Sequence, residues 1–416
     1  MDGDQATGGF VEAGLAQVAP ALQAVIDAGD LSGAVTLIWR KGEVVQVNTL
    51  GLRDRESGAP MERDTLFRIA SMTKPVTSVA ALMLIEEGKL ALTDPITKWL
   101  PEFSDMLVLK DPTGPIDQTY PAPRDITVED LMTHRSGLAY AFTSMGPIAQ
   151  AHEDKLGPPI GTPLTPDRWL KALGSLPLSY PPGERFNYSH STEVLGFLVA
   201  RIEGKPLGQV LKERIFSRLG MSDTDFWCPP AKHGRMAKLY RMNPDTEKLE
   251  DASFPLETAQ PVYEAGGGGL VSTVDDYLKF ARMLLGDGQV DGVRLLKAAT
   301  VRDMRANRLT EAQKQIPFMS LPFWLSQGFG LGLSVVEDSE KHAWIGAGSK
   351  GSFGWPGAFG TWWQADPVED LICIYMIQDS MPLGPEAVAN LAARRGLGGR
   401  AALPVFQKLV YAAIGK

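Results

Sequence analysis

The position of the β-rich segments constrains the fold most, because they lie at the two ends of the chain. Near the N-terminus, GAVTLIWRKGEVVQVNTLG (33–51) forms two β-rich runs around Lys41-Gly42-Glu43, which predicts a hairpin. In the last third, four strand-like runs follow one another: GFGLGLSVVE, HAWIGAGSKGSFG, AFGTWWQAD and LICIYMIQD. We therefore predict an α/β (α+β) fold, with one antiparallel sheet built from both termini, flanked by helices.

The segment between these ends is mostly helical, with loops rich in proline and glycine. We expect residues 1–76 and 242–416 to form the α/β part, and residues 77–241 to form an inserted, largely helical domain. Helical spacing also predicts a first helix from Phe10 to Ala28 and a last helix near Leu403 to Ile414. A chain of 416 residues with 44% hydrophobic content can bury a large core across these parts.

Composition excludes several classes of partner. The net charge is −8 and no cluster of Lys and Arg occurs, so we expect no nucleic-acid partner. The longest apolar runs, VAALMLI and LICIYMI, are too short to span a bilayer, and MDGDQATGG is no signal peptide, so we expect a cytoplasmic protein with no membrane partner. Cys228 and Cys373 form no pattern and no His-x-x-x-His spacing occurs, which predicts no metal.

The first chemical signal is Ser71, which stands three residues before Lys74 in RIASMTKPVTSVAALMLIEEGKL. Apolar residues at helical spacing follow, Gly88 can end that helix, and Pro75 is tolerated only in a first turn, so the helix begins near Ser71. Residues i and i+3 share a helical face, which places the Lys74 ammonium beside the Ser71 hydroxyl. The spacing alone also fits a helix-capping serine beside a surface lysine.

A serine nucleophile needs a proton acceptor, and the sequence favours one other than histidine. Gly-x-Ser-x-Gly is absent, and the five histidines show no local triad signature. Lys74 is at hand, and Tyr188 in PPGERFNYSHSTEVLG is a third group, on an ordered loop before a helix that starts near Ser191. Free tyrosine titrates near ~10, but a neighbouring ammonium stabilises its phenolate form.

Five motifs then occur in a familiar order: SMTK, LMTHRSGL, PPGERFNYSHSTEVLG, GGGGLVSTVDDYLKFARMLL and GSFGWPGAFGTWW. In this the chain resembles the serine β-lactamase and penicillin-binding-protein superfamily, and most closely the β-lactamase-like carboxylesterases of esterase family VIII. The resemblance spans most of the chain, from about Gly33 to Gln378.

The resemblance implies a role for each matching residue. Ser71 matches the acylated nucleophile, Lys74 the lysine that takes or relays its proton, and Tyr188 the general base or proton donor to the alcohol. WPGA matches the strand motif written Lys-Thr-Gly in β-lactamases, with Gly357 in the substrate-binding stretch. Its last residue, Ala358, and Ser71 would supply the two oxyanion N–H groups.

Three departures from the family pattern carry information. Trp355 replaces the lysine that helps β-lactamases hold a carboxylate, which favours neutral esters. Pro356 removes a strand N–H, so we expect a free edge or bulge there. His190 replaces the asparagine of the Tyr-x-Asn motif. It either assists as a polar group in substrate binding or, as we expect more strongly, faces solvent.

We therefore expect a serine carboxylesterase that hydrolyses short-chain carboxylic esters through an acyl-enzyme, with a small-molecule ester as its partner and no cofactor. Three other hypotheses stay open: a β-lactamase or D-amino-acid peptidase, an acyltransferase on the same scaffold, and a catalytically silent binding module. The candidates for the acyl or alcohol pocket are aromatic: Tyr140, Phe142, Trp344, Trp355 and Trp362.

Overall fold

An eight-stranded sheet forms the centre of the computed structural model, which describes residues 5–158, 160–243, 246–256, 259–380 and 400–415. All neighbouring strands are antiparallel. In spatial order the strands are β14 (Gln327–Phe329), β15 (Ser334–Val336), β16 (Phe353–Gly354), β17 (Trp362–Asp366), β18 (Leu371–Met376), β3 (Gly33–Arg40), β4 (Glu43–Asp54) and β5 (Ala59–Pro60). Because β18 pairs with β3, both ends of the chain build one sheet, and the predicted fold class is confirmed.

The hairpin predicted around Lys41-Gly42-Glu43 joins β3 to β4. Lys41 and Gly42 have φ values of 50° and 96°, so both central residues are left-handed. A two-residue hairpin turn of this kind matches the twist of the flanking strands, and glycine adopts it without strain.

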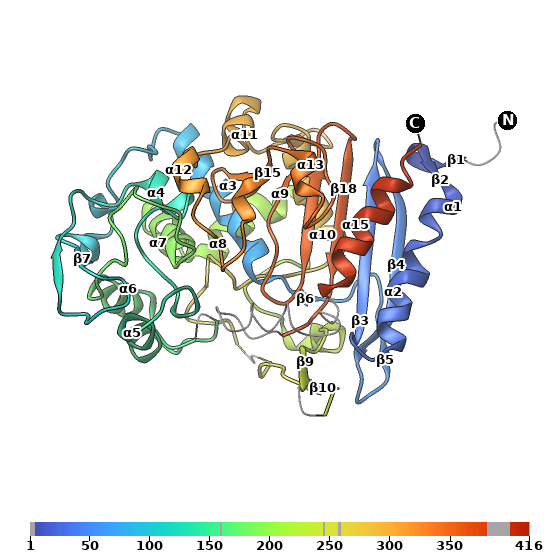
Figure 1. Ribbon diagram of the computed structural model, residues 1–416, viewed down its shortest axis with the longest axis horizontal. Coiled ribbons are helices and arrows are strands. Elements are labelled where there is room, and N and C mark those ends of the chain that lie inside the picture. The colour runs from blue at the N-terminus through green and yellow to red at the C-terminus, as the bar shows by residue number, and fades with distance from the viewer. Residues whose placement is uncertain (1–4, 159, 244–245, 257–258, 381–399, 416) are drawn as a thin grey trace.

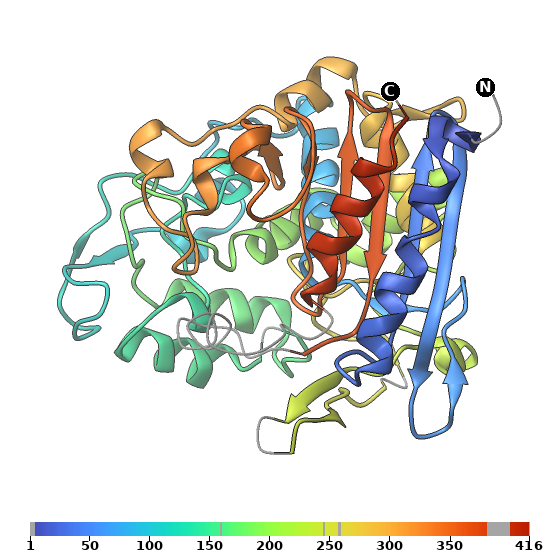
Figure 2. The same cartoon turned by 45° about the vertical axis from the view of Figure 1, so that its right-hand side comes forward.

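One face of the sheet is covered by the two chain ends. The helices α2 (Val18–Asp27) and α15 (Ala402–Ala412) lie side by side there (Figures 1 and 2). They pack on one hydrophobic cluster, which includes Val18, Leu22, Ile38, Trp362, Cys373, Tyr375, Phe406 and Val410. The last helix is where the sequence predicts it.

Two predicted elements differ from the structure. The continuous helix from Phe10 to Ala28 is wrong: β2 (Phe10–Val11) and α1 (Glu12–Leu15) precede α2. Pro20 lacks an N–H and fits only a first turn, so a helix must begin just before it. The strand predicted for HAWIGAGSKGSFG is limited to β16, because its start belongs to α13 (Ser339–His342), a short helix capped by Asp338.

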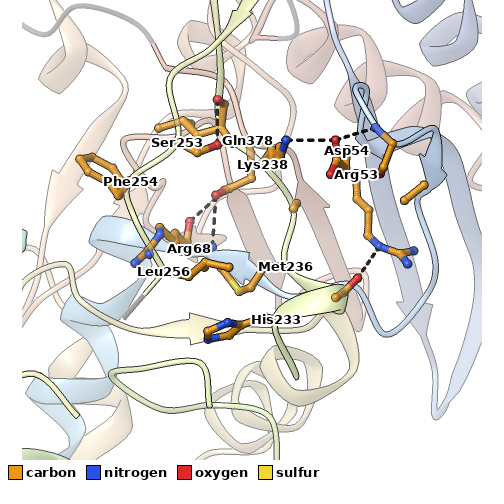
Figure 3. Close-up of a pocket in the computed structure, with 15 residues that line it drawn as sticks. Arg53, Asp54, Arg68, His233, Met236, Lys238, Ser253, Phe254, Leu256 and Gln378 are labelled. Carbon is orange, nitrogen blue, oxygen red and sulfur yellow. Dashed lines mark hydrogen bonds and ion pairs between the residues drawn. The ribbon is translucent and has the colours of Figure 1, made fainter. Parts of the chain in front are cut away.

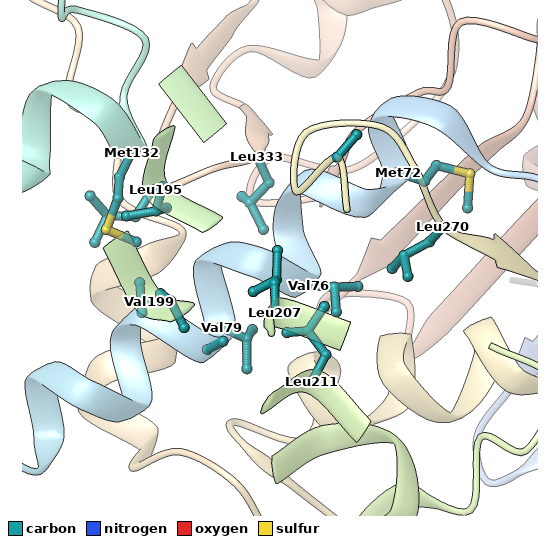
Figure 4. Close-up of a cluster of buried hydrophobic side chains, with 14 of the residues drawn as sticks. Met72, Val76, Val79, Met132, Leu195, Val199, Leu207, Leu211, Leu270 and Leu333 are labelled. Carbon is teal, nitrogen blue, oxygen red and sulfur yellow. The ribbon is translucent and has the colours of Figure 1, made fainter. Parts of the chain in front are cut away.

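The helical part packs against the other face, where α10 (Val274–Leu285) lies on the sheet. Its helices are α3 (Thr73–Glu86), α4 (Val128–Met132), α5 (Pro147–Leu156), α6 (Pro166–Gly174), α7 (Ser191–Glu203) and α8 (Leu207–Leu211). Figure 4 labels Val76 and Val79 of α3, Val199 of α7 and Leu211 of α8, which belong to one buried hydrophobic cluster. One hydrophobic cluster runs from the sheet into these helices, and the domain boundary within α3 stays a prediction.

The helix α3 is central to this packing. Pro75 lies in its first turn, and Gly88, with φ 70°, follows its last residues as predicted. Twelve of its fourteen residues, from Thr73 to Leu84, are buried, so the helix runs through the core rather than over the surface. In the described ranges no helix is both long and apolar enough to cross a membrane.

Candidate active site

Ser71 lies in a 3₁₀ turn, η2 (Ala70–Met72), that leads directly into α3. The residue before it, Ala70, has φ 44°, in the left-handed region that non-glycine residues rarely adopt. Backbone strain of this kind clusters at functional sites, where surrounding packing enforces it. Within the described residues the Ser71 N–H donates to no protein acceptor. The turn thus presents both the hydroxyl and a free N–H.

Lys74 is fully buried and makes three polar contacts. Its Nζ lies 3.3 Å from Ser71 Oγ, 3.1 Å from the Tyr140 hydroxyl and 2.7 Å from the Gly267 carbonyl oxygen. It also lies 4.6 Å from the centroid of the Tyr188 ring. The structure therefore brings Ser71, Lys74 and Tyr188 together, but the tyrosine hydroxyl that Lys74 contacts belongs to Tyr140.

Glu193 is a buried carboxylate that the sequence analysis missed. The Tyr140 hydroxyl donates to both of its oxygens, at 2.8 and 3.0 Å. Burial raises the pKa of Glu193, and the positive charge of Lys74 and the hydrogen bond from Tyr140 oppose that rise. Burial, and then the charge of Glu193, raise the pKa of Tyr140 well above its usual range, so Tyr140 keeps its proton. An acidic residue inside the apolar run STEVLGFLV was the available signal.

Gly267, from the run EAGGGG, makes this arrangement possible in two ways. Its carbonyl accepts from Lys74, and a Cβ at this position would lie only 2.4 Å from Glu193 Oε1. Glycine is therefore required at 267 because the carboxylate occupies the space that a side chain would fill.

Tyr188 lies on the loop before α7 and is held by Trp355. The indole Nε1 of Trp355 donates to the Tyr188 hydroxyl at 3.1 Å. An indole only donates, so the tyrosine oxygen is the acceptor and its own hydrogen stays available. It has no acceptor within the described part of the chain. Phe318 packs against the rings of Tyr188 and Trp355, with centroid distances of 5.6 and 6.1 Å respectively.

The loop after β16 lies against the turn that holds Ser71. A Cβ on Gly357 would come within 2.4 Å of the Ile69 carbonyl oxygen, and Thr361 Oγ1 donates to the same oxygen at 3.2 Å. The Ala358 N–H, like that of Ser71, donates to no acceptor in the described ranges. This places both expected oxyanion donors on neighbouring backbone, without a competing partner.

The free edge or bulge expected at Pro356 is not present. β16 ends at Gly354, between β15 and β17, so the ladder stops two residues before the proline. The missing N–H therefore falls outside the strand, where no ladder hydrogen bond is lost.

His190 does not face solvent, which corrects the stronger of the two expectations. It is buried against Tyr140 and Trp169, with ring centroids 4.3 and 5.2 Å away, and it stacks on His152 at 5.7 Å. Burial, with the charges of His152 and Lys74, lowers the pKa of His190 well below its usual range. His190 therefore stays neutral near pH 7.

The other expected pocket residues separate into two groups. Phe142 stacks on Tyr140, with ring centroids 4.8 Å apart, and lines a cavity beside Tyr188. Trp344 is about half exposed, and Trp362 belongs to the cluster on the opposite face of the sheet. These two tryptophans are therefore not part of the site. All five histidines are described, and none hydrogen-bonds Ser71.

A separate cavity of about 340 Å³ lies at the β4 end of the sheet (Figure 3). Neither Ser71, Lys74 nor Tyr188 lines it. Several of its polar groups bind one another: Lys238 pairs with Asp54 at 3.2 Å, and Gln378 donates to the Arg68 carbonyl at 3.0 Å. Several polar groups of this cavity are therefore already paired with one another.

Comparison with known proteins identifies the family of this chain. A family model described as Beta-lactamase matches residues 17–397. Protein Rv1367c of Mycobacterium tuberculosis is 50% identical over 396 residues, which cover 95% of this chain and 98% of that protein. Esterase EstB of Burkholderia gladioli is 31% identical over 385 residues, which cover 84% and 88%.

Among solved structures, EstCE1, described as a hydrolase with promiscuous acyltransferase activity, superposes with a TM-score of 0.78. It is 27% identical, and the match covers 96% of this chain and 99% of EstCE1. These relatives indicate an enzyme of the serine hydrolase type, and the chain belongs to the β-lactamase family, among its esterase-like members.

Proposed function

We propose that this protein is a serine carboxylesterase that hydrolyses short-chain carboxylic esters through an acyl-enzyme on Ser71. The observation that carries the proposal is the set of three contacts around the buried Lys74 nitrogen, one of which is Ser71 Oγ. The similarity to EstB, an esterase, and to EstCE1, a hydrolase, supports the same activity. The proposed reaction uses no cofactor or metal.

The contacts of Lys74 support a role for it as the base in the first step. The Gly267 carbonyl only accepts hydrogen bonds, and the Tyr140 hydrogen is used on Glu193, so the Tyr140 oxygen also accepts. To act as a base, Lys74 must first give up its charge. The amine then keeps two N–H groups for these acceptors, and its lone pair faces Ser71 Oγ, which lies 3.3 Å away. Lys74 takes the hydroxyl proton while Oγ attacks the ester carbon.

Glu193 is a positioning residue in this scheme, since it acts through Tyr140. Its carboxylate orients the Tyr140 O–H and thereby the amine. It also stabilises the ammonium that forms when Lys74 accepts the proton. The aspartate of a Ser-His-Asp triad stabilises an imidazolium in the same way.

The remaining groups stabilise the oxyanion and release the alcohol. The Ser71 and Ala358 N–H groups bind the oxyanion, and loss of one such donor typically costs ~10²–10³ in rate. When the ester C–O bond breaks, the Tyr188 O–H protonates the departing alkoxide, and the Lys74 ammonium restores that proton. Water then attacks the acyl carbon, its proton passes through the same groups to Ser71, and the acid leaves.

The test compares 4-nitrophenyl butyrate with a chromogenic cephalosporin, for wild type and Ser71→Ala. We expect ester turnover that is lost in the variant, with little β-lactam turnover, because Trp355 replaces the β-lactamase lysine. Mass spectrometry should find the acyl group on the peptide that carries Ser71. Ester turnover that survives in Ser71→Ala would overturn the mechanism, and dominant cephalosporin turnover would favour a β-lactamase.

Acyl transfer to an alcohol is a second candidate, favoured by the acyltransferase activity in the description of EstCE1. The chemistry to the acyl-enzyme is the same, and only the second nucleophile differs. Adding methanol to the ester assay and measuring the methyl ester formed distinguishes the two outcomes.

A further inference from the structure

A cavity of about 230 Å³ lies beside Tyr188, and Arg185 is the only charged side chain among the described residues that line it. Its lining includes Ser144, Ser179, Tyr180, Arg185, Tyr188 and Phe318. None of the described lining residues is acidic, so the charge of Arg185 is not balanced within the cavity. An opposite charge from a ligand would be favoured there.

Arg185 is held in place without using its hydrogen-bond donors. Its guanidinium carbon lies 4.4 Å from the centroid of the Tyr180 ring, a cation–π contact. In the described ranges it forms no ion pair or hydrogen bond, and its buried Nε has no partner. A guanidinium is a planar fork of donors that matches a carboxylate with two parallel bonds.

Two further polar groups of the same cavity lack partners. Ser144 Oγ and Ser179 Oγ are buried without a hydrogen bond in the described structure, and Ser179 is only 4% exposed. Buried polar groups normally find a partner, so unpartnered ones in one cavity call for a ligand or water that satisfies them. Two hydroxyls and a guanidinium together favour an anionic oxygen group.

The cavity is connected to the candidate catalytic residues. Tyr188 lines it directly, and Phe318 spans from it to Trp355. Arg185 is three residues before Tyr188, so their Cα atoms are at most about 10–11 Å apart. A group bound at Arg185 can therefore belong to a molecule whose ester lies at Ser71.

We propose that Arg185, with Ser144 and Ser179, binds a carboxylate on the substrate, so that the substrates are esters bearing a second, free carboxylate. This inference rests on the proposed esterase function. It revises the expectation of neutral esters that was drawn from Trp355. β-Lactamases place a lysine at the position of Trp355, whereas here Arg185, on the loop before Tyr188, would supply the positive charge. The carboxylate belongs either to the acyl part or to the alcohol part of the ester.

The test uses two matched substrate pairs. Mono-4-nitrophenyl adipate against 4-nitrophenyl hexanoate places the carboxylate on the acyl part, and 4-butyryloxybenzoate against phenyl butyrate places it on the alcohol part. For each pair the readout is the ratio of kcat/KM for the charged ester to that for the neutral ester. Wild type, Arg185→Gln, Arg185→Lys and Arg168→Gln are compared. Arg168 is an exposed arginine that does not line the cavity, and it is the matched control.

We expect Arg185→Gln to lower this ratio about 10- to 100-fold for at least one pair, because charge-assisted hydrogen bonds are lost. Most of the change should be in KM. Arg185→Lys should recover part of the ratio, Arg168→Gln should keep it, and salt should reduce it in wild type. A ratio unchanged in Arg185→Gln for both pairs would overturn the inference while Ser71-dependent turnover of the neutral esters leaves the esterase proposal intact. If wild type hydrolyses none of the four esters, the proposed function itself fails.

Discussion

Replacing Glu193 with glutamine tests the proposed role of the buried carboxylate. Glutamine has nearly the same shape, so the fit beside Gly267 is retained while the negative charge is removed. The two hydrogen bonds that join Lys74 to Glu193 through Tyr140 measure 3.1 and 2.8 Å. Their sum sets an upper limit of about 6 Å on the distance between the Lys74 nitrogen and the Glu193 carboxylate. At that distance two unit charges interact by about 3 kcal/mol at an effective dielectric constant near 20.

That energy corresponds to about 100-fold in rate if the proton is fully transferred in the transition state. We therefore expect kcat/KM for 4-nitrophenyl butyrate to fall about 10- to 100-fold in Glu193→Gln, mainly through kcat.

Tyr140→Phe and the double variant complete the experiment. Tyr140 connects Glu193 to Lys74, so the effects of the two single changes should be far from additive in a double-mutant cycle. Thermal unfolding reports whether each variant is folded. A kcat/KM within twofold of wild type in Glu193→Gln, or fully additive effects, would refute the reasoning.

Three further predictions follow from the geometry. Gly267→Ala should lower kcat at least 10-fold, because its Cβ would meet the Glu193 carboxylate at 2.4 Å; steady-state kinetics with wild-type values would contradict this. Trp355→Phe removes the donor to the Tyr188 hydroxyl and should lower kcat/KM about 3- to 10-fold, with a change in the dependence on leaving-group basicity as the check. Burial lowers the pKa of His152 to about 4, so below pH 7 the unfolded chain binds more protons at this residue than the folded chain. The free energy of unfolding should therefore fall by up to about 3 kcal/mol as the pH is lowered from about 7 to 4. Urea unfolding of His152→Gln should show a weaker pH dependence than that of wild type.

The sequence by itself was sufficient for the features that depend on local pattern. β-rich runs at both ends, with helical spacing between them, predicted a sheet that joins the two termini, because burial of an apolar face leaves few other arrangements. The spacing of Ser71 and Lys74 predicted that they share a helix face, since three residues make nearly one turn. The same local logic failed where HAWIGAGSKGSFG began with a capped helical turn instead of a strand.

Only the tertiary structure decided which groups surround the lysine. Gly267 is 193 residues from Lys74, and Glu193 is 53 residues from Tyr140, so no periodicity relates them. His190 shows the same limit: its loop position suggested exposure, whereas packing against Tyr140 and Trp169 buried it. Burying a carboxylate is costly unless it is paired and hydrogen-bonded. Glu193 is therefore tolerated only where the fold provides a hydrogen-bond donor, a positive charge and the space left by a glycine: Tyr140, Lys74 and Gly267. Such a combination of groups exists only in the folded chain. The sequence shows only one sign of it, an acidic residue in an otherwise apolar helix.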